Sequence, residues 1–330
     1  MFSIESRLLH THSIKSHNRI KIMDKNGVQL AKLLRDNTSD TVLAEVKRNF
    51  YYQYHDEMAF NLIEGVFYRI QELFKGGYPG YQACNTDYHD LEHTEEVFLA
   101  SSRIIDGYNM NHELPIEYAV RTLIGALFHD TGYIQEEWDT EGTGAKYTAT
   151  HVDRSIKFLE NNHAVFGIDP ADIQSTCRII KSTEFSMDFN EIPYDSDIER
   201  TAGEILGSAD LMGQMANRAY LEKLLFLYYE FREAGFPGYE TEYDILEKTI
   251  GFYDITNRRL EDSFRGTGSF CRHHFRERYG VDTDMYDDAI KKQISYLNRI
   301  IDDHTTNFRT KLKRGDWIHS NGYSSTVSGH

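Results

Sequence analysis

Several histidines in this chain are spaced so that helices would bring them to one place together with carboxylates. His89 and His93 are four residues apart, and a helix through this tract would place both imidazoles on one face. The dipeptide His129-Asp130 ends an apolar segment with helical spacing, so its ionisable side chains enter the protein interior. Buried groups of this kind need partners, and a metal ion is an economical one. The pattern therefore indicates a metal site.

Two further residues extend the pattern. His151 opens the next segment with helical spacing, and Asp210 stands in the otherwise small and apolar run 205–212, where an unpaired carboxylate would be costly. Imidazole and carboxylate ligands together suit zinc, iron, manganese or magnesium, and the imidazoles favour the transition metals. We expect one ion to be held by His93, His129, Asp130 and Asp210. Asp130 would also bridge to a second ion.

Each element of the pattern has a simpler interpretation when taken alone. A lone His93 is most often an ordinary helix histidine, and a His-Asp dipeptide by itself carries almost no information. His151 has the alternative of opening a helix with its ring facing solvent. Only the combination of these residues favours a metal site.

The elements that must position these residues are predicted to be helices. Only five of the 330 residues are proline, and apolar residues recur at intervals of three and four, which favours an all-α fold. The clearest helix spans 115–128. The arginine- and histidine-rich segment 272–278 is typical of a solvated basic face. Other segments with helical spacing are 41–74, 151–160, 171–183, 198–211, 220–234, 243–260 and 285–301.

Composition limits the domain organisation. The 40% of hydrophobic residues are enough for a sizeable core, and the chain shows no internal repeat and no linker. The simplest division is an N-terminal extension at 1–44, one catalytic domain at 45–310 and a flexible C-terminal tail at 311–330.

Charge and cysteine content exclude several classes of partner. Lysine and arginine number 36 against 52 acidic residues, and a formal charge of −16 argues against binding to a nucleic-acid polymer. No stretch approaches the roughly 20 apolar residues of a membrane span, and no signal peptide is evident. Three widely spaced cysteines form no disulfide framework. We therefore expect a cytoplasmic protein that acts on a small molecule; whether it forms a homodimer is left open.

The order and spacing of these residues resemble those of the HD-domain metal-dependent phosphohydrolase superfamily. Within it, the chain is similar to the catalytic domain of cyclic-nucleotide phosphodiesterases, which carries a Tyr-His-Asn-x-x-His tract followed by a valine. Here the tract is Tyr88-His89-Asp90-Leu91-Glu92-His93, with Val97 after it. The family continues with a Glu-Phe pair and a Gly-Phe, which Glu230-Phe231 and Gly251-Phe252 match.

The resemblance implies a fold and a set of roles. It implies an all-α helical bundle of the HD-domain and phosphodiesterase kind, with two divalent metal ions (Zn, Mn, Mg or Fe). By the same comparison His89 is the general acid, His151 holds the second ion, and Phe252 is the aromatic wall that stacks on a base. Thr249 stands near the position where the family places a purine-reading glutamine.

The sequence also departs from the family. Asp90 replaces the asparagine of the first tract, and Thr131-Gly132-Tyr133 follows Asp130 where the family carries an Asp and then a His. These three residues are closer to the HD-GYP-like branch of the superfamily, although the lysine of that branch is absent.

The function implied by these observations is phosphoester hydrolysis. We expect the protein to cleave a phosphoester of a nucleotide or cyclic nucleotide by metal-activated hydroxide, with Asp130 and His89 as catalytic residues. Two alternatives remain open: a di-iron HD oxygenase, and a catalytically silent HD module that binds a nucleotide and regulates a partner.

Overall fold

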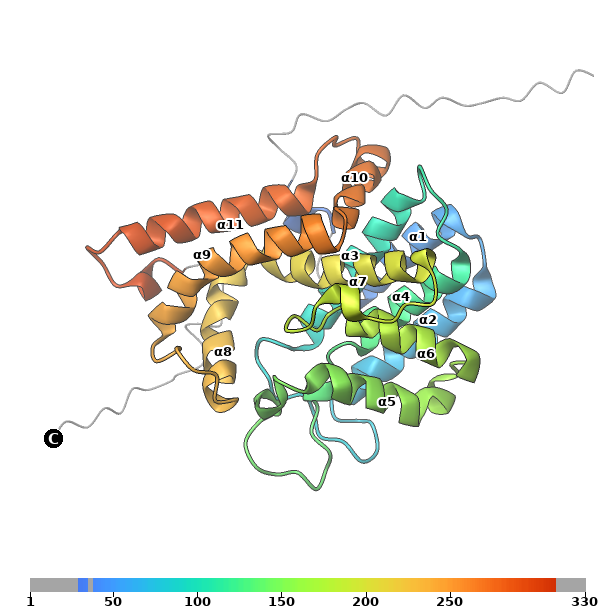
Figure 1. Ribbon diagram of the computed structural model, residues 1–330, viewed down its shortest axis with the longest axis horizontal. Helices are drawn as coiled ribbons and strands as arrows, with labels where there is room; N and C mark the ends of the chain where they lie inside the picture. Colours follow the sequence, from blue (N-terminus) through green and yellow to red (C-terminus); the bar gives the residue numbers. More distant parts are fainter. Residues whose placement is uncertain (1–28, 35–37, 313–330) are drawn as a thin grey trace, which may run out of the picture.

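The protein is built from helices. A computed structural model describes residues 29–34 and 38–312, and in these residues the backbone forms α-helices joined by short 3₁₀ and π turns, with no β-strand (Figure 1). The expected all-α fold is confirmed. The helices are α1 (Ser39–Gln53), α2 (Glu57–Phe74), α3 (Leu91–Tyr108), α4 (Ile116–Phe128), α5 (His151–Phe166), α6 (Pro170–Lys181), α7 (Asp197–Ala216), α8 (Tyr220–Glu233), α9 (Glu242–Arg258), α10 (Cys271–Tyr279) and α11 (Met285–Asp302).

Capping residues set where many of these helices begin and end. The side chains of Asp56, Asp90 and Ser196 each accept a backbone N–H of the first turn, in α2, α3 and α7 respectively. Gly167 and Gly280 end α5 and α10 in the left-handed conformation, with φ of 73° and 68°. These signals explain why the segments with helical spacing became separate helices.

Helices α3 and α7 form the centre of the molecule. They pack against each other, and α1, α4 and α10 also pack on α3, while α4, α6 and α11 pack on α7. Figure 1 shows α5 and α6 along one edge of this centre, α9 and α11 along the opposite one, and α8 below α9. Ligands carried on α3 and α7 are therefore held by the best-packed part of the fold.

The expected division of the chain is changed at its start. The boundary at residue 45 falls inside α1, whose Val42, Leu43 and Val46 are buried in the core. This helix belongs to the folded unit rather than to an extension. At the other end, Leu312 is buried and the hydroxyl of Tyr296 donates to the carbonyl of Lys311, whereas the rest of the expected tail lies outside the described residues.

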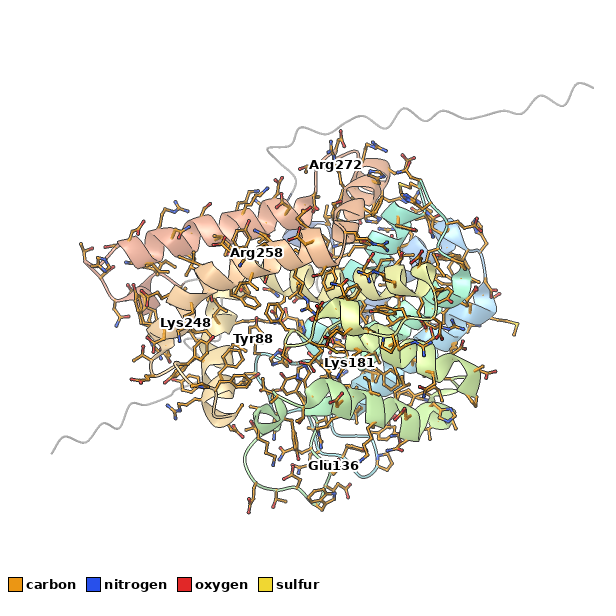
Figure 2. All side chains as sticks on the ribbon, in the orientation of Figure 1. Tyr88, Glu136, Lys181, Lys248, Arg258 and Arg272 are labelled. Carbon is orange, nitrogen blue, oxygen red and sulfur yellow. The ribbon has the colours of Figure 1, made fainter. Side chains whose placement is uncertain are left out.

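The basic segment 272–278 is a solvated face only in part, because one side of it is buried against α3. It lies in α10, where the His274 side chain is fully buried and its Nδ1 lies 2.7 Å from Oδ2 of Asp106. Arg278 donates to both carboxylate oxygens of Asp106, at 2.7 and 2.9 Å. Arg272 and Arg276 are exposed and fit the prediction. Figure 2 shows Arg272 at the edge of the molecule, whereas Tyr88 lies in the interior. The basic composition of the segment did not reveal this burial. His274 and Arg278 are four residues apart, so both side chains lie on the face of α10 that contacts Asp106 of α3.

No helix in the described parts of the chain is both long enough and apolar enough to cross a membrane.

Candidate metal centre

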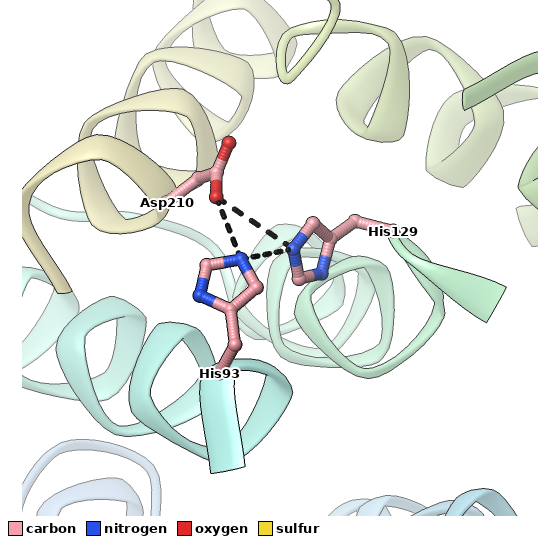
Figure 3. Close-up of side chains that lie close together, drawn as sticks. All are labelled: His93, His129 and Asp210. Carbon is pink, nitrogen blue, oxygen red and sulfur yellow. Dashed lines mark hydrogen bonds and ion pairs between the residues drawn. The ribbon is translucent and has the colours of Figure 1, made fainter. Parts of the chain in front are cut away.

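Three separate helices deliver the side chains of the candidate centre. His93 lies in the first turn of α3, His129 caps the C-terminus of α4, and Asp210 lies two-thirds of the way along α7. Figure 3 shows the three side chains pointing toward one another from these helices. The helix ends and the central α3–α7 contact thus place potential ligands at one point inside the protein.

The ligand atoms are close enough to share one ion. Nε2 of His93 lies 3.3 Å from Nε2 of His129 and 3.2 Å from Oδ1 of Asp210, and the His129 nitrogen lies 3.7 Å from the same oxygen. A metal with bonds of about 2.0–2.2 Å keeps neighbouring ligand atoms roughly 3–3.6 Å apart. The observed spacing is therefore that of a coordination sphere.

Asp130 adds a fourth potential ligand on the other side of the two rings. Its Oδ2 lies 3.3 Å from Nε2 of both His93 and His129. This oxygen is buried and has no hydrogen-bond partner among the described residues. A buried carboxylate oxygen without a donor is costly, and a cation between it and the two nitrogens would satisfy it.

Electrostatics also favour a cation at this point. Burial alone lowers the pKa of His93, but the adjacent carboxylates of Asp130 and Asp210 outweigh burial and raise it to about 10. Burial would raise the pKa of Asp130, yet the charge of His129 holds it well below its usual range. Without a metal the carboxylates thus draw protons onto the imidazoles. A divalent ion would supply the same positive charge.

Backbone carbonyls orient two of the imidazoles. Nδ1 of His129 lies 2.8 Å from the carbonyl oxygen of Ala126, and Nδ1 of His151 lies 2.7 Å from that of Thr148. A carbonyl oxygen can only accept, so each Nδ1 carries a proton, and Nε2 has the lone pair when the ring is neutral. This is the tautomer that binds a metal through Nε2.

His151 lies next to the centre at the start of α5. Its Nε2 is 3.6 Å from Oδ1 of Asp130, so this carboxylate faces two imidazoles with one oxygen and His151 with the other. Gly132 allows this approach, because a Cβ there would lie 1.9 Å from the carbonyl oxygen of His151. Ser155 Oγ ties α5 to the same segment by accepting from the Gly132 N–H and donating to the His129 carbonyl. The arrangement suits Asp130 as a bridge between two ions.

His89 reaches the centre from a loop rather than from a helix. The prediction that His89 and His93 share a helix face is wrong, because Asp90 accepts the N–H of His93 and so caps α3, which begins at Leu91. The rings of His89 and His93 are nevertheless 5.9 Å apart. The capping role also gives a structural reason for an aspartate at position 90.

A carboxylate and an aromatic ring hold His89 in place. Its Nδ1 lies 2.6 Å from Oε2 of Glu230 on α8. Tyr133 stacks on the His89 ring at 4.3 Å and on the His151 ring at 4.5 Å, with interplanar angles of 12° and 22°. The tyrosine therefore spaces the two histidines on one side of the centre.

The residues of the centre differ in their exposure to solvent. The side chains of His93, His129 and Asp130 are at most 4% exposed. Those of His89, Asp210 and His151 are 13%, 17% and 19% exposed. These last three residues therefore form the more exposed side of the centre.

The two residues expected to bind substrate differ in their burial. Thr249 is buried, and its hydroxyl donates to the carbonyl of Ile245 at 2.7 Å within α9. Its role in binding substrate stays a prediction. Phe252 is partly buried, packs near Leu211, and has its ring 5.1 Å from that of Phe185. Its stacking role stays a prediction.

Two residues of the site carry little signal in the sequence. In the sequence, Glu230 is recognisable only as part of the Glu-Phe pair of the family, and Tyr133 only as a position where the chain differs from the family. Their roles arise from contacts between segments far apart in the chain: Glu230 is 141 positions from His89, and Tyr133 is 44 positions from it.

Replacing His151 tests whether two ions bind. His151→Ala should lower the metal content from about two to about one per chain and leave the fold intact, because the other ligands remain. Metal analysis by mass spectrometry after dialysis measures this. His163→Ala, on the same helix but bonded to the Ile168 carbonyl, is the matched control and should keep the wild-type content. An unchanged content in His151→Ala would return His151 to the role of a helix-opening histidine.

Comparison with known proteins adds one partial match. The profile of a family described as Npun_R2479-like matches residues 136–259. The matched segment includes His151 and Asp210 but ends short of His93, His129 and Asp130 on the N-terminal side. No curated protein matches the chain.

Proposed function

We propose that this protein is an HD-type metal-dependent hydrolase that cleaves a phosphoester of a nucleotide or cyclic nucleotide in the cytoplasm. The observation that carries the proposal is the convergence of ligand atoms from His93, His129 and Asp210. Asp130 lies against both imidazoles, and the His89 ring is close to that of His93. A site with two imidazoles and two carboxylates suits a transition-metal ion, to which an anionic small molecule can bind.

The divalent ions, when bound, would polarise the phosphoester, lower the pKa of a water molecule and neutralise developing charge. The residues of the chain have complementary tasks. Asp130 faces His93 and His129 with Oδ2 and His151 with Oδ1, so it can hold two ions at a fixed separation. The chain itself carries a strongly negative net charge, so the local attraction for an anionic substrate must come from the centre.

His89 is placed to give a proton to the leaving oxygen. Glu230 accepts from Nδ1, which leaves Nε2 directed away from Glu230, 3.5 Å from the Tyr133 hydroxyl. A carboxylate behind an imidazole fixes its tautomer and its orientation. The His89 side chain is 13% exposed, on the more exposed side of the centre. The group is therefore suited to general acid catalysis.

The leaving group distinguishes this role from metal binding. His89→Ala should leave the metal content unchanged and lower kcat by about 10²- to 10⁴-fold for a substrate with an alkoxide leaving group. A nitrophenyl phosphoester, whose leaving group scarcely needs a proton, should lose much less. Steady-state kinetics on both substrates with the same protein preparation measure the difference. Equal losses on the two substrates would contradict the acid role.

A further inference from the structure

A second cavity lies outside the metal centre, along the other side of α3. Its volume is about 290 Å³, and it is bounded by α3, the end of α7, the start of α8 and the short segment Leu30–Lys32. None of the five proposed metal ligands lines it. Part of the wall is apolar and consists of Leu30, Leu34, Val42, Leu99 and Ala216.

Arg103 gives this cavity an unsatisfied positive charge. The residue is 2% exposed, and its guanidinium donates one hydrogen bond, from Nη1 to the Tyr286 hydroxyl at 3.1 Å. Nε and Nη2 are buried and have no hydrogen-bond partner within residues 29–34 and 38–312. The rings of Phe275 and Tyr286, at 5.7 and 5.9 Å, give only cation–π contacts. A guanidinium stays charged at any ordinary pH, so burying it without an anion is costly.

The glutamates that line the same cavity do not supply that anion. Glu92 pairs with Lys223 at 2.9 Å, and Glu95 accepts from the Gln71 amide at 3.1 Å. Glu96 accepts from the Asn217 amide, and burial raises the pKa of Glu96 to about 8, which leaves it mostly uncharged at neutral pH. The guanidinium thus faces a cavity whose acidic groups have other partners.

We propose that this cavity binds a small organic monocarboxylate, with its carboxylate on Nε and Nη2 of Arg103 and its apolar body against Leu34, Val42 and Leu99. Nε and one Nη form the two-pronged donor that matches the two oxygens of a carboxylate. The apolar wall suits an aliphatic body. The neighbouring glutamates favour a ligand of single charge over a doubly charged phosphate.

Calorimetric titration of the full chain with hexanoate tests the proposal. Wild type should bind one hexanoate per chain with a Kd of about 1 mM or tighter, and the neutral hexanamide should bind at least about tenfold more weakly. Arg103→Gln should weaken hexanoate binding by about tenfold or more. Arg218→Gln is the matched control, because Arg218 lines the same cavity but is exposed, and its Kd should stay within about twofold of wild type.

A second variant tests ligand binding in this cavity if Arg103→Gln does not fold. Ala31→Trp adds bulk at the cavity wall from an exposed position and leaves Arg103 in place, so it should abolish hexanoate binding. The proposal is overturned if wild type shows no saturable binding up to about 10 mM, or if folded Arg103→Gln or Ala31→Trp binds as wild type does. Tighter binding of hexyl phosphate than of hexanoate would overturn the carboxylate assignment.

Discussion

Asp130→Ala is expected to remove both metal ions and nearly all hydrolytic activity. Asp130 is the only side chain in the described structure that lies within 4 Å of the ring nitrogens of His93, His129 and His151 together. Without it the two ion positions lose their common ligand. Metal ions contribute several kcal/mol to catalysis of this kind, so kcat/KM should fall by about 10³-fold or more.

Metal analysis and kinetics on the same sample measure this effect. Asp153→Ala is the control, because Asp153 lies in the first turn of α5 and forms a largely exposed ion pair with Lys181 at 2.6 Å. It should keep wild-type metal content and activity. An Asp130→Ala protein that keeps two ions per chain would show that Asp130 is not the bridge.

The largest expected effect on stability comes from the buried carboxylate of Asp106. Asp106 is fully buried and accepts hydrogen bonds from Gln53 at 2.6 Å, from His274 and from Arg278. Asp106→Asn removes the charge that Arg278 faces and presents an amide to one of these donors. Breaking a buried pair of this kind costs about 3–5 kcal/mol, which corresponds to a fall in Tm of roughly 10 °C.

An exposed ion pair that also involves α10, through Arg272, gives a matched comparison. Arg272 and Asp282 pair at 2.9 Å with side chains 54% and 42% exposed, so Asp282→Asn should change the unfolding free energy by less than about 1 kcal/mol. Thermal and urea unfolding of both variants measure the two effects. Similar changes in both would contradict the account of α10 as a helix anchored through its buried face.

Acid should remove the Asp106 contribution in a defined range. Burial by itself would raise the pKa of Asp106, but the hydrogen bonds from His274 and Arg278 outweigh it and lower the pKa to about 2 from its ordinary 3.8. The stabilisation is therefore complete above about pH 4 and is lost as the pH falls through about 2. The difference in stability between wild type and Asp106→Asn should shrink over that range.

Local sequence patterns predicted the all-α fold and which residues gather at the candidate centre, for a physical reason. The segment 116–128 has an apolar stripe that needs burial, and this places His129 and Asp130 at an interior helix end. Asp210 is detectable in the same way, because a carboxylate among small and apolar residues needs a partner. These signals are local, and a single sequence contains them.

The remaining features depend on contacts between distant segments. The stack of Tyr133 between His89 and His151 joins two loops and a helix, and no periodicity reports it. Asp90 acts as the N-cap, so α3 begins at Leu91 and does not extend back through His89. The burial of Thr249 in α9, with its hydroxyl donating to the Ile245 carbonyl, also depends on how α9 packs and is not visible in the sequence.

The most direct test of the proposed metal centre is anomalous X-ray diffraction from crystals of the protein soaked in Mn²⁺. The proposal predicts a strong anomalous peak about 2.0–2.3 Å from Nε2 of His93, Nε2 of His129 and a carboxylate oxygen of Asp210, with a second peak beside Asp130 and His151. No peak within bonding distance of His93, or a peak bound only by residues elsewhere in the chain, would contradict it.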